Sequence, residues 1–159
     1  DQSDALKAMT KRWSYIDSNR VGIWGHSGGG SMTLNMLLRY PDLYKMGISI
    51  APVADQRLYD SVYQERYSGL LSDYADGYKE GSPITHAKNL QGKLLLIHGT
   101  GDDNVHYQGT ERLINEFVKH NRQFDFMSYP NRSHSLREGD GTTVHLKTMM
   151  TNYFNKHLK

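Results

Sequence analysis

Residues 25–29 read Gly-His-Ser-Gly-Gly, a G-x-S-x-G pattern with a serine between two glycines. A short apolar run at residues 21–25 leads into it, and a helical pattern at residues 28–40 follows. A chain that turns this sharply from strand to helix holds the serine in strained backbone, and the glycines avoid side-chain collisions. The hydroxyl then points out above the sheet, and the next amide faces developing negative charge at a helix N-terminus. The pattern therefore predicts Ser27 as a nucleophile and Gly28 as an oxyanion donor.

A glycine-rich loop can also bind phosphate, and G-x-S-x-G by itself arises by chance in many proteins. A phosphate loop requires a lysine followed by serine or threonine after its glycines. Residues 31–33 read Ser-Met-Thr instead, which disfavours phosphate binding. The strand before the pattern and the helix after it favour a nucleophile.

Two later segments supply an acid and a base, each at the end of a predicted strand. Asp102 follows an apolar run at residues 93–98, and His134 lies in a polar loop after residues 124–129. Taken singly, the aspartate could cap the next helix and the histidine could be a solvated surface residue. Hydrolases of the α/β type, however, present serine, acid and histidine in this order, each after a successive strand. The order predicts Ser27, Asp102 and His134 as nucleophile, acid and base.

The elements that must position these residues alternate along the chain. Apolar runs typical of buried strands occupy residues 21–25, 46–50, 93–98 and 124–129, and helical periodicity covers 4–16, 28–40, 110–120 and 143–157. Strands alternating with helices indicate βαβ crossovers and a mainly parallel sheet. The fold class is therefore α/β, one sheet flanked by helices. The stretch at residues 51–92, about 40 residues, is long for a connector in a compact domain, and such connectors usually carry function.

Composition narrows the function classes. The chain has 159 residues, of which 37% are hydrophobic and 23% charged, the balance of one globular domain. A net charge of +2 gives no electrostatic case for a nucleic-acid partner, and no apolar run approaches the roughly 18 residues of a membrane helix. The lack of cysteine excludes disulfides and a thiol nucleophile, and the histidines show no H-E-x-x-H spacing. We expect no metal and no cofactor.

Two longer segments are more specific than the serine pattern. Residues 96–106 (L-I-H-G-T-G-D-D-N-V-H) and 59–67 (Y-D-S-V-Y-Q-E-R-Y) resemble characteristic stretches of the prolyl oligopeptidase family of serine peptidases, in its dipeptidyl peptidase IV branch. The resemblance runs from about residue 19 to the end and implies an α/β-hydrolase fold. It implies that Asp102 is the triad acid and that Asp103 is structural. It also implies an S1 pocket lined by Val53, Tyr59, Tyr63 and Val105, and a substrate carbonyl held by Arg66 and Asn104.

The tyrosine assignments have an alternative explanation, and the sequence differs from close relatives at two positions of the implied pocket. Tyr59 and Tyr63 are four residues apart and could simply be buried on one helical face. Gly28 stands where close relatives carry tyrosine, and Gln56 stands where they carry tryptophan. The loss of two aromatic walls implies a roomier S1 pocket that admits alanine or larger apolar residues as well as proline.

The resemblance also implies parts outside these 159 residues. Family members carry an N-terminal β-propeller whose glutamate pair captures the substrate's amino terminus, and a tyrosine that serves as a second oxyanion donor. We expect one catalytic domain over residues 1–159, truncated at its N-terminus, with an exposed sheet edge. On its own it should fold poorly and be nearly inactive. A homodimer through the last helix and a periplasmic or extracytoplasmic location are family-level expectations.

The sequence thus predicts a serine-type peptidase acting on peptide substrates, releasing N-terminal dipeptides through an acyl-enzyme. One alternative is an acyl-peptide hydrolase or esterase with the same triad, which the segment at residues 59–67 disfavours and Gly28 keeps open. A second alternative is a catalytically silent homologue that acts as a binding module.

Overall fold

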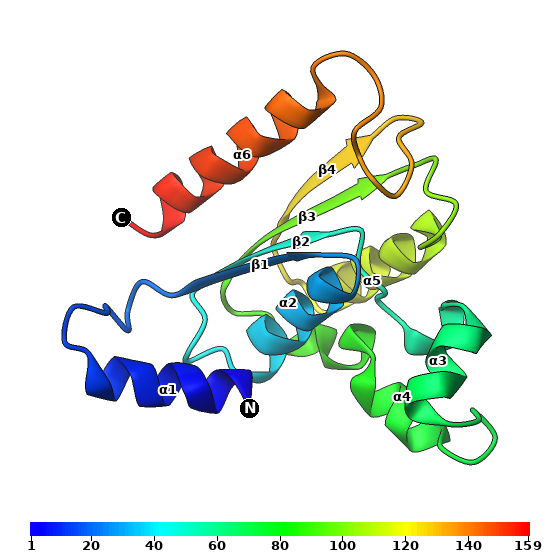
Figure 1. Ribbon diagram of the computed structural model, residues 1–159, viewed down its shortest axis with the longest axis horizontal. Helices are drawn as coiled ribbons and strands as arrows, with labels where there is room; N and C mark the ends of the chain where they lie inside the picture. Colours follow the sequence, from blue (N-terminus) through cyan, green and yellow to red (C-terminus); the bar gives the residue numbers. More distant parts are fainter.

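Four short strands pair side by side in chain order and form one parallel sheet (Figure 1). In the computed structural model, which describes residues 1–159, the strands are β1 (Gly22–His26), β2 (Met46–Ile50), β3 (Lys93–Gly99) and β4 (Asp125–Tyr129). The register aligns His26 with Ile50 and Ile50 with Ile97, so the carboxyl ends of neighbouring strands meet at one edge. Loops that follow different strands are thereby brought together at that edge.

Helices cover both faces of this sheet, as the alternation of strands and helices predicted. The main helices are α1 (Gln2–Arg12), α2 (Gly28–Arg39), α5 (Tyr107–Lys119) and α6 (Thr142–His157). Figure 1 shows α2 and α5 on one face and α6 on the other. The three layers give an α/β fold whose sheet is entirely parallel.

The central strand β3 contributes to two separate hydrophobic clusters. Leu94 and Leu96 pack in a cluster with side chains of α2 and α5, whereas Leu95 and Ile97 pack in a cluster with side chains of α6. Successive strand residues point to opposite faces, so an uninterrupted apolar run is what a strand covered on both sides requires. All four side chains are at most 4% exposed, and burying each one contributes about 1.5–3 kcal/mol.

The long connection between β2 and β3 folds into short helical pieces. These are η1 (Gln56–Leu58), α3 (Ser61–Ser68), α4 (Ala75–Gly81) and η2 (Pro83–Asn89). Asp60 begins α3 by accepting hydrogen bonds from the amides of Val62 and Tyr63 at 2.8 and 3.3 Å. Asp55, which is 1% exposed, anchors the start of the segment through two hydrogen bonds of 2.8 Å from Arg57.

One predicted helix is shorter in the structure. The helix predicted over residues 4–16 ends at Arg12, where Trp13 turns to extended backbone, and Met9 of this helix is 42% exposed. The buried strand predicted over residues 21–25 is β1, the outermost of these four strands on one side, and its Trp24 is 52% exposed. Lys147 of α6 lies 5.4 Å from the centre of that indole ring.

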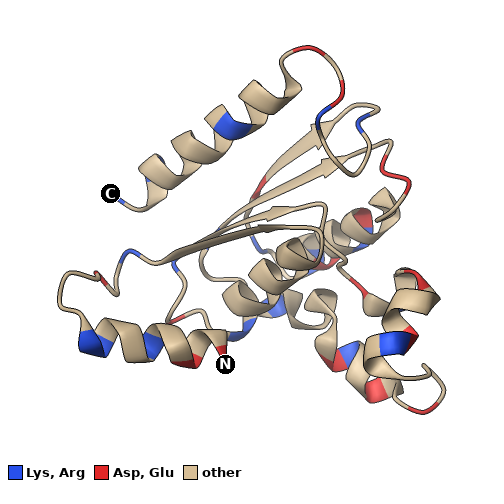
Figure 2. Cartoon of the chain, in the orientation of Figure 1, with Lys and Arg blue, Asp and Glu red and all other residues tan.

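Charge is spread over the molecule. Figure 2 shows lysine and arginine interspersed with aspartate and glutamate along the helices and loops. No helix combines the length and the apolar character that crossing a membrane requires.

Candidate active site

Ser27 occupies the turn between β1 and α2. Its φ of 60° and ψ of −124° lie outside the regions that residues with side chains favour, at a cost of about 1–3 kcal/mol. Its amide donates a hydrogen bond of 2.8 Å to the carbonyl oxygen of Ile50 in β2. A Cβ atom added at Gly25 would lie 2.2 Å from the carbonyl oxygen of Gly29, so glycine is required there. The turn therefore has the strained geometry that the G-x-S-x-G pattern predicted.

Three side chains from three loops meet in front of this turn. His134, in the loop after β4, places Nε2 2.9 Å from the Ser27 hydroxyl oxygen. Its Nδ1 lies 2.7 Å from Oδ2 of Asp102, in the loop after β3. The His134 side chain is 20% exposed and the Asp102 side chain is fully buried. In this arrangement the imidazole can accept the serine proton while the carboxylate stabilises the resulting imidazolium.

The Asp102 carboxylate also caps the turn before α5, which is the structural role that the sequence offered as an alternative to catalysis. Its Oδ1 accepts hydrogen bonds from the amides of Asn104 and Val105 at 3.0 and 2.9 Å, which closes a turn ahead of α5. The turn uses one carboxylate oxygen and leaves the other for His134. Asp103 is exposed, in keeping with its assignment outside the catalytic group.

Two histidines near the triad had no predicted role. His26 places Nε2 2.8 Å from the carbonyl oxygen of His134, and the two rings lie 4.9 Å apart. Burial lowers the pKa of His26, which favours the neutral ring. His98 places Nε2 3.1 Å from Asp102 Oδ2. Each is a polar residue closing an apolar strand, a signal that could have singled them out.

The loop that carries His134 is held by Glu138. This carboxylate accepts hydrogen bonds from the hydroxyls of Ser133 and Ser135, the residues on either side of His134. The hydrogen bond from Ser133 is the main cause that lowers the pKa of Glu138 to about 2, so the carboxylate is charged at any physiological pH. Leu136 anchors the same loop, because its side chain is buried in the hydrophobic cluster between the sheet and α6.

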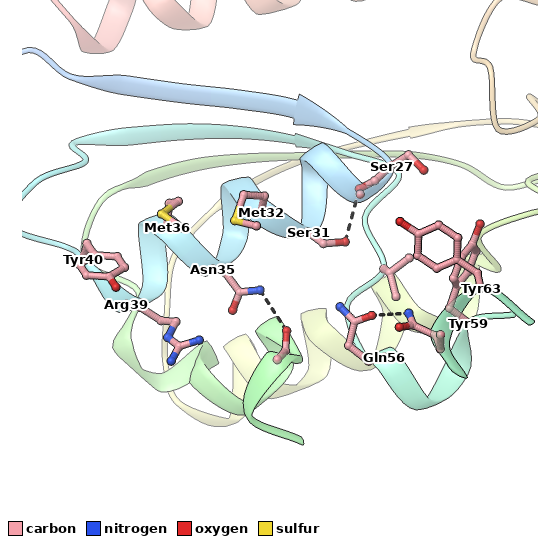
Figure 3. A pocket seen from close by; sticks show the side chains of 14 residues that line it. Ser27, Ser31, Met32, Asn35, Met36, Arg39, Tyr40, Gln56, Tyr59 and Tyr63 are labelled. Atoms are coloured by element: carbon pink, nitrogen blue, oxygen red, sulfur yellow. Dashed lines mark hydrogen bonds between the residues drawn. The ribbon is translucent and has the colours of Figure 1, made fainter. Parts of the chain in front are cut away.

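A cleft of about 500 Å³ opens beside Ser27 and runs along the exposed face of α2 (Figure 3). Val53, Tyr59 and Tyr63, three of the residues that the resemblance assigned to an S1 pocket, line it near the serine. Gly28, the first residue of α2, lines it too and leaves it open on that side. The cleft continues past Met32, Asn35, Met36 and Gln56 to Arg39.

The remaining substrate-binding candidates, Val105, Asn104 and Arg66, do not line this cleft. Val105 borders a small adjoining cavity together with Val53 and Tyr59. Asn104 accepts a hydrogen bond of 3.0 Å from the Tyr59 hydroxyl. Arg66 lies in the last turn of α3, with its guanidinium 5.8 Å from the centre of the Tyr67 ring.

Tyr59 and Tyr63, which lie near Ser27, are not core residues. Tyr63 is 51% exposed, and Tyr59 and Tyr63 contact each other edge to face with ring centres 5.4 Å apart. The core-packing interpretation therefore does not account for Tyr63. No group of three or more histidine, aspartate or glutamate side chains is arranged to hold a metal ion.

A parallel sheet flanked by helices, with a serine at a strained strand-to-helix turn and acid and histidine in later loops, defines the α/β-hydrolase fold. The comparisons with known proteins give the family. The model of the prolyl oligopeptidase family matches residues 1–159, and the chain belongs to that family.

Its relatives include dipeptidyl peptidases. The chain is 36% identical over 159 residues to dipeptidyl peptidase 4 of Felis catus, covering 98% of this chain and 20% of the relative. It is 39% identical over 140 residues to venom dipeptidyl peptidase 4 of Apis mellifera, covering 86% and 18%. The crystal structure of Porphyromonas gingivalis dipeptidyl peptidase 4 superimposes with a TM-score of 0.92 at 40% identity, covering 98% of this chain and 22% of that one. The chain thus spans about a fifth of the length of these relatives.

Proposed function

We propose that this chain supplies the catalytic centre of a serine-type peptidase that releases dipeptides from the amino terminus of peptide substrates. The observation that carries the proposal is the continuous set of contacts from Ser27 through His134 to Asp102, at 2.9 and 2.7 Å. Similarity to proteins named dipeptidyl peptidase 4 supports the class of substrate.

The proposed reaction uses these three side chains in turn. His134 takes the hydroxyl proton of Ser27 as the oxygen attacks the carbonyl carbon of the scissile bond. The Gly28 amide, at the N-terminus of α2, stabilises the oxyanion. His134 then gives the proton to the leaving amine as the C–N bond breaks, which leaves an acyl-enzyme. Water, deprotonated by the same imidazole, releases the dipeptide and restores the serine.

The cleft beside Ser27 is the proposed S1 pocket. Val53, Tyr59 and Tyr63 supply its apolar and aromatic walls, and Gly28 leaves the α2 side open. Gly28 places no side chain beside Ser27, and a Cβ atom there would meet no heavy atom within 4 Å, so we propose that the pocket accepts alanine and larger apolar residues as well as proline at P1.

An esterase or acyl-peptide hydrolase activity is the second candidate. The opening at Gly28 favours it, because an acyl group with no fixed amino terminus could enter from that side. The same triad would carry out either reaction, so the substrate must decide between them.

The test uses the intact natural protein with a Ser27→Ala control. Unblocked and N-blocked Xaa-Pro, Xaa-Ala and Xaa-Leu chromogenic substrates are compared, and labelling of Ser27 by a fluorophosphonate is measured. We expect Ser27-dependent release from unblocked dipeptides only. Equal cleavage of blocked substrates, or of esters alone, would replace the dipeptidase with the second candidate. Absence of labelling would mean a silent binding module.

A further inference from the structure

His98, close to the carboxyl end of β3, is an imidazole that the core encloses completely. Its Nδ1 lies 2.7 Å from the hydroxyl oxygen of Thr110 in the second turn of α5. Its Nε2 lies 2.9 Å from the carbonyl oxygen of Val105 and 3.1 Å from Oδ2 of Asp102. Thr110 is also fully buried, so bulk water does not reach either ring nitrogen.

These partners determine which nitrogen of His98 carries the proton. The Val105 carbonyl and the Asp102 carboxylate only accept hydrogen bonds, so Nε2 must be the donor. Burial lowers the pKa of His98 and favours the neutral ring, which has one N–H. Nδ1 is then an acceptor, and the Thr110 hydroxyl must donate to it.

Asp102 Oδ2 consequently lies between two imidazoles. It accepts a hydrogen bond from His134 at 2.7 Å and another from His98 at 3.1 Å. The first contact belongs to the proposed reaction. The second comes from a residue that cannot reach the cleft, because the core encloses it.

We propose that Thr110 and His98 are positioning residues of the active site, joined as a hydrogen-bonded pair that aims the Asp102 carboxylate at His134. The threonine hydroxyl donates to Nδ1 and holds the ring of His98 in place. The Nε2–H of His98, which the Val105 carbonyl shares, then helps the amides of Asn104 and Val105 to fix the rotation of the carboxylate. This role rests on the proposed function, since it acts through the triad. It extends the line of contacts from Ser27 by two residues into the core.

The groups around His98 are few. Tyr107 of α5 contacts the ring edge to face, with ring centres 5.4 Å apart, and its own hydroxyl donates to Ser128 at 3.1 Å. Asp102 and His134 are the ionisable groups that act on it electrostatically. The Thr110 hydroxyl is the one hydrogen-bond partner of His98 Nδ1.

The test exchanges the hydroxyl of Thr110 while keeping its shape. Thr110→Val keeps the branched side chain and removes the donor, whereas Thr110→Ser keeps the donor and removes a methyl group. In the intact natural protein, the second-order rate constant for fluorophosphonate labelling of Ser27 is measured, and the labelling end point counts competent sites. This reactivity does not depend on which peptide or ester is the natural substrate.

We expect Thr110→Val to lower the rate constant about tenfold. The buried Nδ1 of His98 loses its hydrogen-bond donor, so His98 holds the Asp102 carboxylate less firmly in the orientation that faces His134. Thr110→Ser should remain within about twofold of the wild type, since the hydroxyl is retained. A packing role alone gives the opposite order, because serine leaves a methyl-sized cavity and valine does not. That order, or equal rate constants, would overturn the positioning role alone. A wild type that is not labelled would overturn the proposed function together with it.

Discussion

Gly28 allows the width of the proposed S1 pocket to be changed by one residue. It begins α2 and lines the cleft beside Ser27. A Cβ atom added there meets no heavy atom within 4 Å, and Gly28 is not among the glycines with positive φ. A tyrosine at this position should therefore be accepted without backbone strain, and its ring should form a wall of the cleft.

The size of the effect follows from the surface that such a wall covers. One aromatic face against a bound proline removes about half the surface of three ring methylenes from water. At roughly 0.8 kcal/mol per methylene this is worth about 1.2 kcal/mol. The value of kcat/KM for proline at P1 should then rise about eightfold in Gly28→Tyr, and the ratio of proline over leucine should rise by a similar factor because the bulkier leucine does not fit against the added ring. The leucine side chain also loses room, which adds to the change.

The assay compares unblocked Xaa-Pro and Xaa-Leu substrates with the intact natural protein. Gly28→Ala is the matched control, because it adds a Cβ atom without a wall and should leave the ratio within about twofold. A substitution at Gln56 would disturb the interior as well as the cleft, because Gln64, which is 5% exposed, donates a hydrogen bond to the Gln56 side chain. An unchanged or smaller ratio in Gly28→Tyr would show that this cleft does not bind P1.

Three further predictions follow from the site. Gly25→Ala should abolish labelling of Ser27, because the added Cβ would lie 2.2 Å from a backbone oxygen, at a cost above about 3 kcal/mol. Labelling at the wild-type rate would show that glycine is not required at this position. Glu138→Gln should slow labelling about threefold to tenfold, because a neutral amide accepts more weakly from the serines beside the catalytic base; an unchanged rate would contradict it. The pKa values of His26 and His98 lie below 6.5, chiefly through burial, so the unfolded chain binds more protons in mildly acidic solution. The free energy of unfolding should therefore fall as the pH drops from 7.5 to 5.5, by at most about 1.4 kcal/mol per histidine per pH unit; urea titrations that show a rise would refute the sign.

The candidate triad could be found from the sequence because topology restricts where such residues can lie. Ser27, Asp102 and His134 are individually weak signals, but each follows a separate apolar run. Parallel strands bring the ends of such runs to one edge of the sheet, and the structure places the three side chains in contact. The apolar runs gave all four strands to within a residue or two.

Other features depend on contacts that periodicity does not encode. The contact of His98 with Asp102 requires knowing which ring atom faces which carboxylate oxygen, and a strand pattern gives only the position of the residue. Helix α3, between β2 and β3, lacks a clear apolar face, because Gln64 is its only buried residue.

The strand order has a consequence for how the active site comes into being during folding. Ser27 and His134 are 107 residues apart, yet their contact requires β1 through β4 to have paired in register. Each pairing is a non-local parallel contact, the kind that forms slowly. Reactivity of the serine should therefore appear only when the whole sheet is complete. In a refolding time course of the intact natural protein, fluorophosphonate labelling would report the last cooperative step, whereas helix content measured by circular dichroism would rise earlier.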